Sequence, residues 1–309
     1  MCIKIYCRKV VVNKPDYLRL KGPVLFAANH PNSFLDGIIL TTLLEENLYS
    51  LARGDAFKQP RIKRLLYWLH LLPVYRTSEG VENLEHNYTT FRACHEVFAA
   101  GGQVMIFSEG RCINEWHLRP LKKGTARLAI STWEKGIDLT VIPVGFNYNT
   151  FRNFGKNVFI HFGVPMQKGA ILQESSDGRK LLAFNDQLNG QLAGLVYEID
   201  PKDRKALKEK VYVPQPLFKK VLLAFPALAG AIIHAPLYFT AKAVTKKYFD
   251  NDHFDSVVAA LLMLAYIIYL PLLCLIGWML LNWKAGIALL FIIPFCAWAC
   301  VQLKDQLES

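Results

Sequence analysis

The chain has 309 residues, of which 52% are hydrophobic, and it carries a formal net charge of +11. Its seven cysteines are scattered without zinc-ligand spacing, which favours a reduced compartment over a disulfide framework or a zinc site. A basic protein attracts anionic partners, and the absence of a Lys/Arg-rich arm, zinc finger or RNA-binding signature argues for lipid headgroups or phosphorylated substrates and against nucleic acid.

Short apolar runs alternate with helical patterns over the first two thirds of the chain. This alternation predicts an α/β domain with a mostly parallel sheet flanked by helices. The stretch 200–212 is highly charged and is expected to be a solvated connector. Strands are expected at 24–28, 48–52, 72–75, 104–107, 139–146 and 158–162, and helices at 34–46, 61–69, 80–99, 124–135 and 179–199.

One predicted helix, 61–69, combines Arg61, Lys63 and Arg64 with aliphatic and aromatic residues. Such a helix either lies on an anionic membrane surface or packs in the core with a solvated basic face. The sequence favours the core helix slightly.

Charged residues are absent from long runs in the C-terminal part. Residues 257–281 form a charge-free run of 25, which is long enough to cross a bilayer. A second run, 287–303, follows after five residues, so the two predict a transmembrane hairpin. The run 221–241 holds Pro226 and Pro236, and is interpreted either as a broken, re-entrant segment or as a spanning helix.

These patterns divide the chain into an α/β domain, 1–212, and a membrane-anchoring region, 213–309. Lys4, Arg8 and Lys9 interrupt the N-terminal apolar stretch, so no signal peptide is expected. The α/β domain is therefore expected at a membrane, facing the cytoplasm.

A polar cluster stands at the joint between the strand 24–28 and the helix that follows. His30 at a strand end with Asp36 nearby is an arrangement suited to a general base and its orienting carboxylate. The pair Ser33 and Asp36 also fits a helix capping box, with His30 as a structural histidine. These two residues alone favour the structural interpretation.

Charged residues also follow two other predicted strands. Arg76 follows 72–75, and Glu109, Gly110 and Arg111 follow 104–107. Lysines open the helix 124–135, and a helix N-terminus favours phosphate. Because the carboxyl ends of parallel strands meet at one edge, these residues are candidates for one site.

The order of these motifs resembles the glycerolipid acyltransferase family, the phospholipid/glycerol acyltransferases. Two departures are present: five residues separate the histidine from the aspartate instead of the commonest four, and Ser108 replaces a proline. The first is similar to a branch that includes glycerol-3-phosphate and dihydroxyacetone-phosphate acyltransferases. The matching blocks are Asn29-His30-Pro31-Asn32-Ser33-Phe34-Leu35-Asp36, Pro73-Val74-Tyr75-Arg76, Phe107-Ser108-Glu109-Gly110 and Ile142-Pro143-Val144-Gly145.

The resemblance implies the glycerolipid acyltransferase fold and a membrane-bound O-acyltransferase of phospholipid biosynthesis. His30 would take the proton from a hydroxyl of glycerol-3-phosphate or dihydroxyacetone phosphate, and Asp36 would orient His30. Acyl-CoA or acyl-ACP would supply the acyl group, and neither a cofactor nor a metal is expected. The residues expected to bind the acceptor's phosphate and hydroxyls are Arg76, Glu109, Gly110 and Arg111.

Other functions remain as alternatives. Lysophosphatidate is the closest alternative acceptor, because it also carries a phosphate and a glycerol hydroxyl. A non-catalytic lipid-binding membrane protein is more remote, since His30, Asp36, Arg76 and Glu109 are all present. A serine hydrolase is disfavoured by the absence of a Gly-x-Ser-x-Gly motif.

Overall fold

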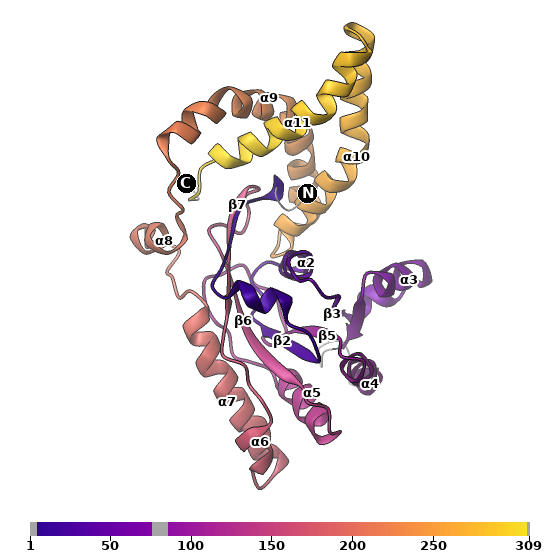
Figure 1. The fold of residues 1–309 in the computed structure, drawn as a ribbon, viewed down its shortest axis with the longest axis vertical. Helices are drawn as coiled ribbons and strands as arrows, with labels where there is room; N and C mark the ends of the chain where they lie inside the picture. Colours follow the sequence, from indigo (N-terminus) through magenta and orange to yellow (C-terminus); the bar gives the residue numbers. More distant parts are fainter. Residues whose placement is uncertain (1–4, 76–85, 308–309) are drawn as a thin grey trace.

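The computed structural model describes residues 5–75 and 86–307. Its centre is a seven-stranded sheet in the order β1-β7-β6-β2-β5-β3-β4 (Figure 1). Neighbouring strands are parallel except β6 and β7, so the predicted mostly parallel sheet is confirmed. The strands are β1 (Cys7–Val12), β2 (Val24–Ala28), β3 (Leu48–Arg53), β4 (Leu71–Val74), β5 (Gln103–Phe107), β6 (Thr140–Tyr148) and β7 (Lys156–Phe162).

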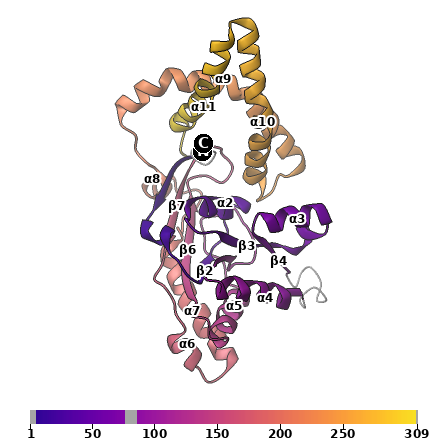
Figure 2. The same ribbon diagram turned by 45° about the vertical axis from the view of Figure 1, so that its right-hand side comes forward.

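Helices cover both faces of this sheet. Figures 1 and 2 show α2 (Phe34–Leu43) and α3 (Pro60–Trp68) on one side of the sheet, and further helices on the other. All five residues of β2 are buried because both of its faces are covered. The helices of the second side are α4 (His86–Ala99), α5 (Lys123–Glu134), α6 (Gly169–Gln173) and α7 (Asp177–Leu195), and two short 3₁₀ turns are η1 (Pro15–Arg19) and η2 (Gly54–Phe57).

Several sequence predictions are corrected by these elements. The strand β1 was not predicted, because Arg8 and Lys9 interrupt its apolar pattern; Arg8 is in fact buried, and its Nε donates to Asn157 Oδ1 at 3.1 Å. The charged connector contains a helix, α8 (Arg204–Val211), whose start is capped by the Asp203 side chain. The predicted helix 80–99 begins outside the described residues.

The helix α3 packs against η2 and β4 at the edge of the sheet. No residue of α3 is buried, and Ile62 and Leu65 are exposed. The core-helix interpretation that the sequence slightly favoured is therefore wrong.

Three helices after α8 are long and apolar enough to cross a membrane, judged by length and composition within the described part of the chain. They are α9 (Leu217–Tyr248), α10 (Phe254–Leu280) and α11 (Trp283–Leu303). The helices α10 and α11 pack together as an antiparallel hairpin whose connecting turn points away from the sheet (Figure 1).

The segment that contains Pro226 and Pro236 is not broken, because α9 runs through both prolines as one helix of 32 residues. Figure 1 shows that α9 is bent, as expected where proline removes a backbone hydrogen bond. Near its start, Lys219 Nζ donates to Gln302 Oε1 at 2.7 Å, and Gln302 Nε2 donates to the backbone of β1. Just beyond its end, Asp250 pairs with Arg152 of the α/β domain. Both ends of α9 are thus tied to the same domain.

The contact between α9 and α11 depends on a small residue. A Cβ atom added at Gly230 would lie 2.1 Å from the backbone oxygen of Cys296. Small residues at membrane-type helix contacts permit this close approach of two backbones.

We expect Gly230→Ala to lower the thermal unfolding midpoint of the protein in detergent, because overpacking of this kind costs about 1–3 kcal/mol. Gly194→Ala is the control, since nothing lies within 4 Å of its added Cβ in α7. That variant should be neutral or stabilising by up to about 1 kcal/mol, because alanine is the better helix former. Equal midpoints for the two variants would contradict the close contact.

Candidate active site

His30 and Asp36 form a hydrogen-bonded pair at the carboxyl end of β2. His30 follows the strand directly, and Asp36 lies in the first turn of α2. The distance from His30 Nδ1 to Asp36 Oδ2 is 2.9 Å, with Asp36 fully buried and the His30 side chain 14% exposed. Because an ionised carboxylate only accepts, Nδ1 carries the proton. His30 Nε2 is then free to accept, and no described residue bonds to it.

Two further groups hold the Asp36 carboxylate. The backbone N–H of Asn32 donates to Oδ2 at 2.9 Å, and the hydroxyl of Tyr148 donates to Oδ1 at 2.5 Å. Burial and the charge of Asp36 raise the pKa of Tyr148 well above its usual value, so the hydroxyl stays protonated as a donor. No sequence motif included Tyr148, although it stands three residues after the block that ends at Gly145.

The turn between His30 and Asp36 is not a capping box. Ser33 has a φ of +53°. A positive φ, uncommon for a residue other than glycine, occurs here in the turn that carries the longer His–Asp spacing. The Ser33 hydroxyl lies 2.6 Å from His253 Nδ1 and makes no cap bond to α2. The Asp36 carboxylate bonds to Asn32 rather than to the N-cap residue. The capping-box interpretation is therefore wrong.

Glu109 connects two loops of the site through backbone hydrogen bonds. Its Oε2 accepts from the N–H of His30 at 2.7 Å, and its Oε1 accepts from the N–H of Arg119 at 2.9 Å. Burial raises the pKa of Glu109, and the two backbone bonds oppose that shift. In this arrangement the carboxylate fixes the backbone at His30, a positioning role that sequence reasoning did not anticipate.

The glycine after Glu109 permits a sharp turn toward α5. Gly110 has a φ of +67°, and a Cβ there would lie 3.1 Å from Lys122 Cγ. Ser108, which stands where the family motif has proline, receives a hydrogen bond from Thr125 Oγ1 at 3.0 Å, and its carbonyl accepts from Lys122 N–H at 2.8 Å. The serine thus ties the end of β5 to the start of α5.

The structure brings His30, Asp36, Glu109 and Gly110 together at one edge of the sheet. Arg111 follows this group and is exposed. Arg76 lies outside the described residues. Among the residues the structure describes, no group of three or more His, Cys, Asp or Glu side chains is arranged to hold a metal ion.

Two further residues of the matched blocks have packing roles. Phe107, the last residue of β5, stacks on the imidazole with ring centroids 3.7 Å apart. Gly145 of the fourth block is required by packing, because a Cβ there would lie 2.6 Å from the backbone oxygen of Leu195 in α7.

The start of α10 holds the turn between His30 and Asp36 in place. The buried carboxylate of Asp255 accepts hydrogen bonds from Lys156, from Tyr6 and, at 3.2 Å, from Asn32 Nδ2. The hydroxyl of Ser256 donates to the Asn32 carbonyl at 3.1 Å. The two contacts with Asn32 join residues more than 200 positions apart in the sequence, and no local pattern indicated them.

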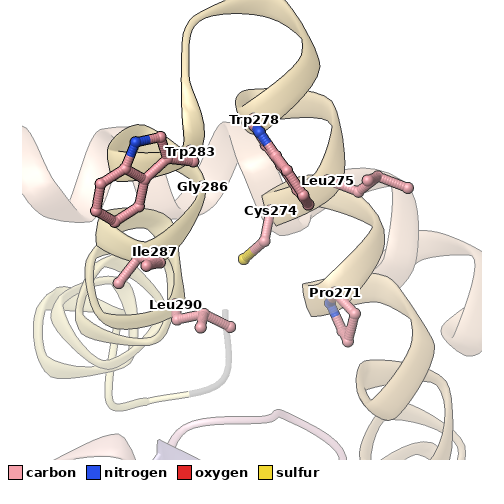
Figure 3. Close-up of a pocket in the computed structure, with 8 residues that line it drawn as sticks. All are labelled: Pro271, Cys274, Leu275, Trp278, Trp283, Gly286, Ile287 and Leu290. Carbon is pink, nitrogen blue, oxygen red and sulfur yellow. The ribbon is translucent and has the colours of Figure 1, made fainter.

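A hollow of about 480 Å³ lies between α10 and α11, away from this site (Figure 3). Its lining is apolar and includes Trp278, Trp283 and Leu290 near the turn of the hairpin. Because no lining residue belongs to the α/β domain, this hollow is separate from His30 and Asp36.

We expect Glu109→Gln to lower the free energy of unfolding by about 1–3 kcal/mol, because the amide NH₂ would face one of two buried N–H donors. Urea denaturation in detergent measures this change. Glu134→Gln is the matched control, since Glu134 makes an exposed pair with Lys180 and should change stability by less than about 1 kcal/mol. Equal losses in the two variants would contradict the positioning role of Glu109.

Comparison with known proteins gives a family match and a structural match. Residues 9–147 match the family model named Acyltransferase. Among solved structures, the crystal structure of PlsC, the 1-acyl-sn-glycerophosphate (LPA) acyltransferase from Thermotoga maritima, matches with 16% identity and a TM-score of 0.40, over 60% of this chain and 70% of that chain. No curated protein matches the sequence. The matched residues include the strands that precede His30 and Glu109 and the helix that carries Asp36, and this part of the chain resembles the glycerolipid acyltransferase family.

Proposed function

We propose that this protein is a membrane-bound O-acyltransferase of phospholipid biosynthesis. It transfers a fatty acyl group from acyl-CoA or acyl-ACP to a hydroxyl of glycerol-3-phosphate or dihydroxyacetone phosphate. The observation that carries this proposal is the His30 imidazole, whose Nδ1 is bonded to buried Asp36 and whose Nε2 is left as an acceptor. The membrane-capable helices support a bilayer location. We propose that the α/β domain faces the cytoplasm.

In the proposed reaction, His30 Nε2 takes the proton from the acceptor's hydroxyl as its oxygen attacks the thioester carbonyl carbon. Asp36 stabilises the imidazolium that forms. The tetrahedral intermediate collapses with cleavage of the carbon–sulfur bond, and the imidazolium returns its proton to the leaving thiolate. The products are the acyl ester and the free thiol of CoA or ACP. Because Asn32 and Tyr148 already hold Asp36, the base needs little rearrangement.

A phosphorylated acceptor suits the charges around the dyad. Arg111 follows the Glu109 turn, and Lys122 and Lys123 stand at the start of α5, where the helix dipole also favours an anion. The family resemblance assigns acceptor binding to Arg76 and Arg111, as charge-assisted partners of the phosphate. Glu109 and Gly110 would contribute by fixing the loop that carries these groups.

Lysophosphatidate is the second candidate acceptor, because the same base and the same basic residues serve it equally well. A non-catalytic lipid-binding role is disfavoured by the intact and well-held dyad. The distinction between acceptors rests on whether a second acyl chain is accommodated beside the donor's chain.

The test is acyl transfer by the purified protein in detergent. Acyl-CoA and acyl-ACP are each supplied with labelled glycerol-3-phosphate, dihydroxyacetone phosphate or lysophosphatidate. We expect product from one of the first two acceptors, and a loss of roughly 10²–10⁴-fold in kcat for His30→Ala, because a general base contributes about that factor. His117→Ala is the control, since His117 is exposed and pairs with Glu198.

The outcomes separate the alternatives. Product from lysophosphatidate alone would retain the mechanism and change the acceptor. Transfer that survives His30→Ala, or no transfer to any acceptor, would contradict the catalytic role of the dyad.

A second prediction concerns Tyr148, which touches Asp36 and is proposed to act only through it. We expect Tyr148→Phe to lower kcat roughly 10-fold or more with KM unchanged, because a hydrogen bond to a charged group contributes about 1.5–3 kcal/mol. Steady-state kinetics on the accepted substrate measure both constants. Tyr197→Phe, a half-buried tyrosine of the same domain without a bond to Asp36, should leave kcat unchanged. A change in KM alone would argue against this role.

A further inference from the structure

The helix α3 presents an apolar face that no described residue covers. Ile62, Leu65 and Leu69 recur at spacings of three and four and therefore share one side of the helix. They are 41%, 52% and 49% exposed, and Trp68 beside them is 75% exposed. Aliphatic residues on the central stripe of an amphipathic helix normally face a core, so their exposure calls for an occupant outside the described part of the chain.

The same segment is strongly basic. Lys58, Arg61, Lys63 and Arg64 lie in or beside α3, and the stretch 56–75 contains no Asp or Glu. None of the ion pairs found in the described residues involves these four bases. The occupant of the apolar face is therefore expected to be anionic as well as apolar.

The position of α3 also matters. Figure 2 shows α3 on the side of the sheet that carries α2, facing the lower end of α10. The exposed side chains of Phe34 and Ile38 in α2 add apolar surface to the same side. The three membrane-capable helices are expected to place the chain at a bilayer. The first turn of α10 lies on the same side of the sheet as α3.

We propose that α3 is an interfacial helix that lies in the headgroup layer of an anionic bilayer. Ile62, Leu65 and Leu69 enter the acyl boundary, and Trp68 sits at the headgroup level, where its amphipathic ring is favoured. Arg61, Lys63 and Arg64 contact the lipid phosphates from the flanks of the helix. This contact is independent of the acceptor and of catalysis, and it orients the sheet edge toward the membrane.

Two other occupants fit less well. An acidic carrier protein would complement the charges of Arg61, Lys63 and Arg64. Its polar surface would leave the aliphatic side chains of Ile62 and Leu65 without apolar contacts. A second copy of the chain would bring the same bases against one another. A bilayer with anionic headgroups satisfies both the charged and the apolar parts of the surface.

The test is amide hydrogen exchange of the full chain, reconstituted in nanodiscs of phosphatidylcholine alone and of phosphatidylcholine mixed with phosphatidylglycerol. The readout is the exchange rate of peptides covering residues 60–69. Each base near an anionic surface contributes roughly a five-fold preference. We therefore expect exchange to be at least about 10-fold slower in the anionic discs than in the neutral discs.

Two variants separate the charged and apolar contributions. Arg61→Gln/Lys63→Gln/Arg64→Gln should abolish the difference between the two disc types, and Leu65→Ser/Leu69→Ser should speed exchange in both. The control variant is Lys205→Gln/Lys208→Gln/Lys210→Gln in α8, a basic helix whose apolar residues Leu207 and Val211 are buried. It should leave exchange of residues 60–69 unchanged.

Three outcomes would overturn the proposal. Equal exchange of residues 60–69 in both discs and in detergent would mean that the helix has no membrane contact. Protection in detergent that rises with protein concentration would assign the face to a second copy. Protection that appears only when acyl carrier protein is added would assign it to an acidic protein partner.

Discussion

The fold depends on one buried carboxylate, Asp255, at the start of α10. Its partners are Lys156 on β7, Tyr6 ahead of β1, and Asn32 in the turn between His30 and Asp36. A buried charge is tolerated only when it is paired and hydrogen-bonded. Removal of one partner leaves the other charge buried and unpaired in a low-dielectric interior. Because its partners come from the sheet and from the candidate site, the hairpin of α10 and α11 and the turn between His30 and Asp36 form one structural unit.

The dyad itself is organised in the same way. Asp36 is buried, and its three donors are His30, Asn32 and Tyr148. Asn32 therefore serves both carboxylates: its backbone N–H bonds to Asp36 and its side-chain amide bonds to Asp255. This shared residue makes the geometry of the general base sensitive to how α10 begins, even though α10 contributes no group to the proposed reaction.

The sequence predicted what local periodicity and motif order encode. The strands that lead into His30 and Glu109 are short apolar runs, and the charge-free runs of α10 and α11 leave little ambiguity. What it did not predict depends on contacts distant in the chain. The strand β1 carries a buried arginine, and α9 continues through two prolines. The local sequence around Asp255 indicates only an acidic residue in the first turn of a helix. The exposure of α3 also escaped prediction, because an amphipathic pattern does not say what covers its apolar face.

The close association of distant segments has a consequence for the order in which the protein matures. The Gln302 amide bonds to the backbone of Arg8 across 294 residues, and the Tyr6–Asp255 contact spans 249. During vectorial synthesis the sheet can assemble long before α10 and α11 emerge, since domains fold in turn as the chain is made. Until then the turn that carries Asn32 lacks its hydrogen bonds to Asp255 and Ser256. The proposed base would therefore reach its final geometry only after the hydrophobic hairpin is in place, which would couple the onset of activity to membrane insertion.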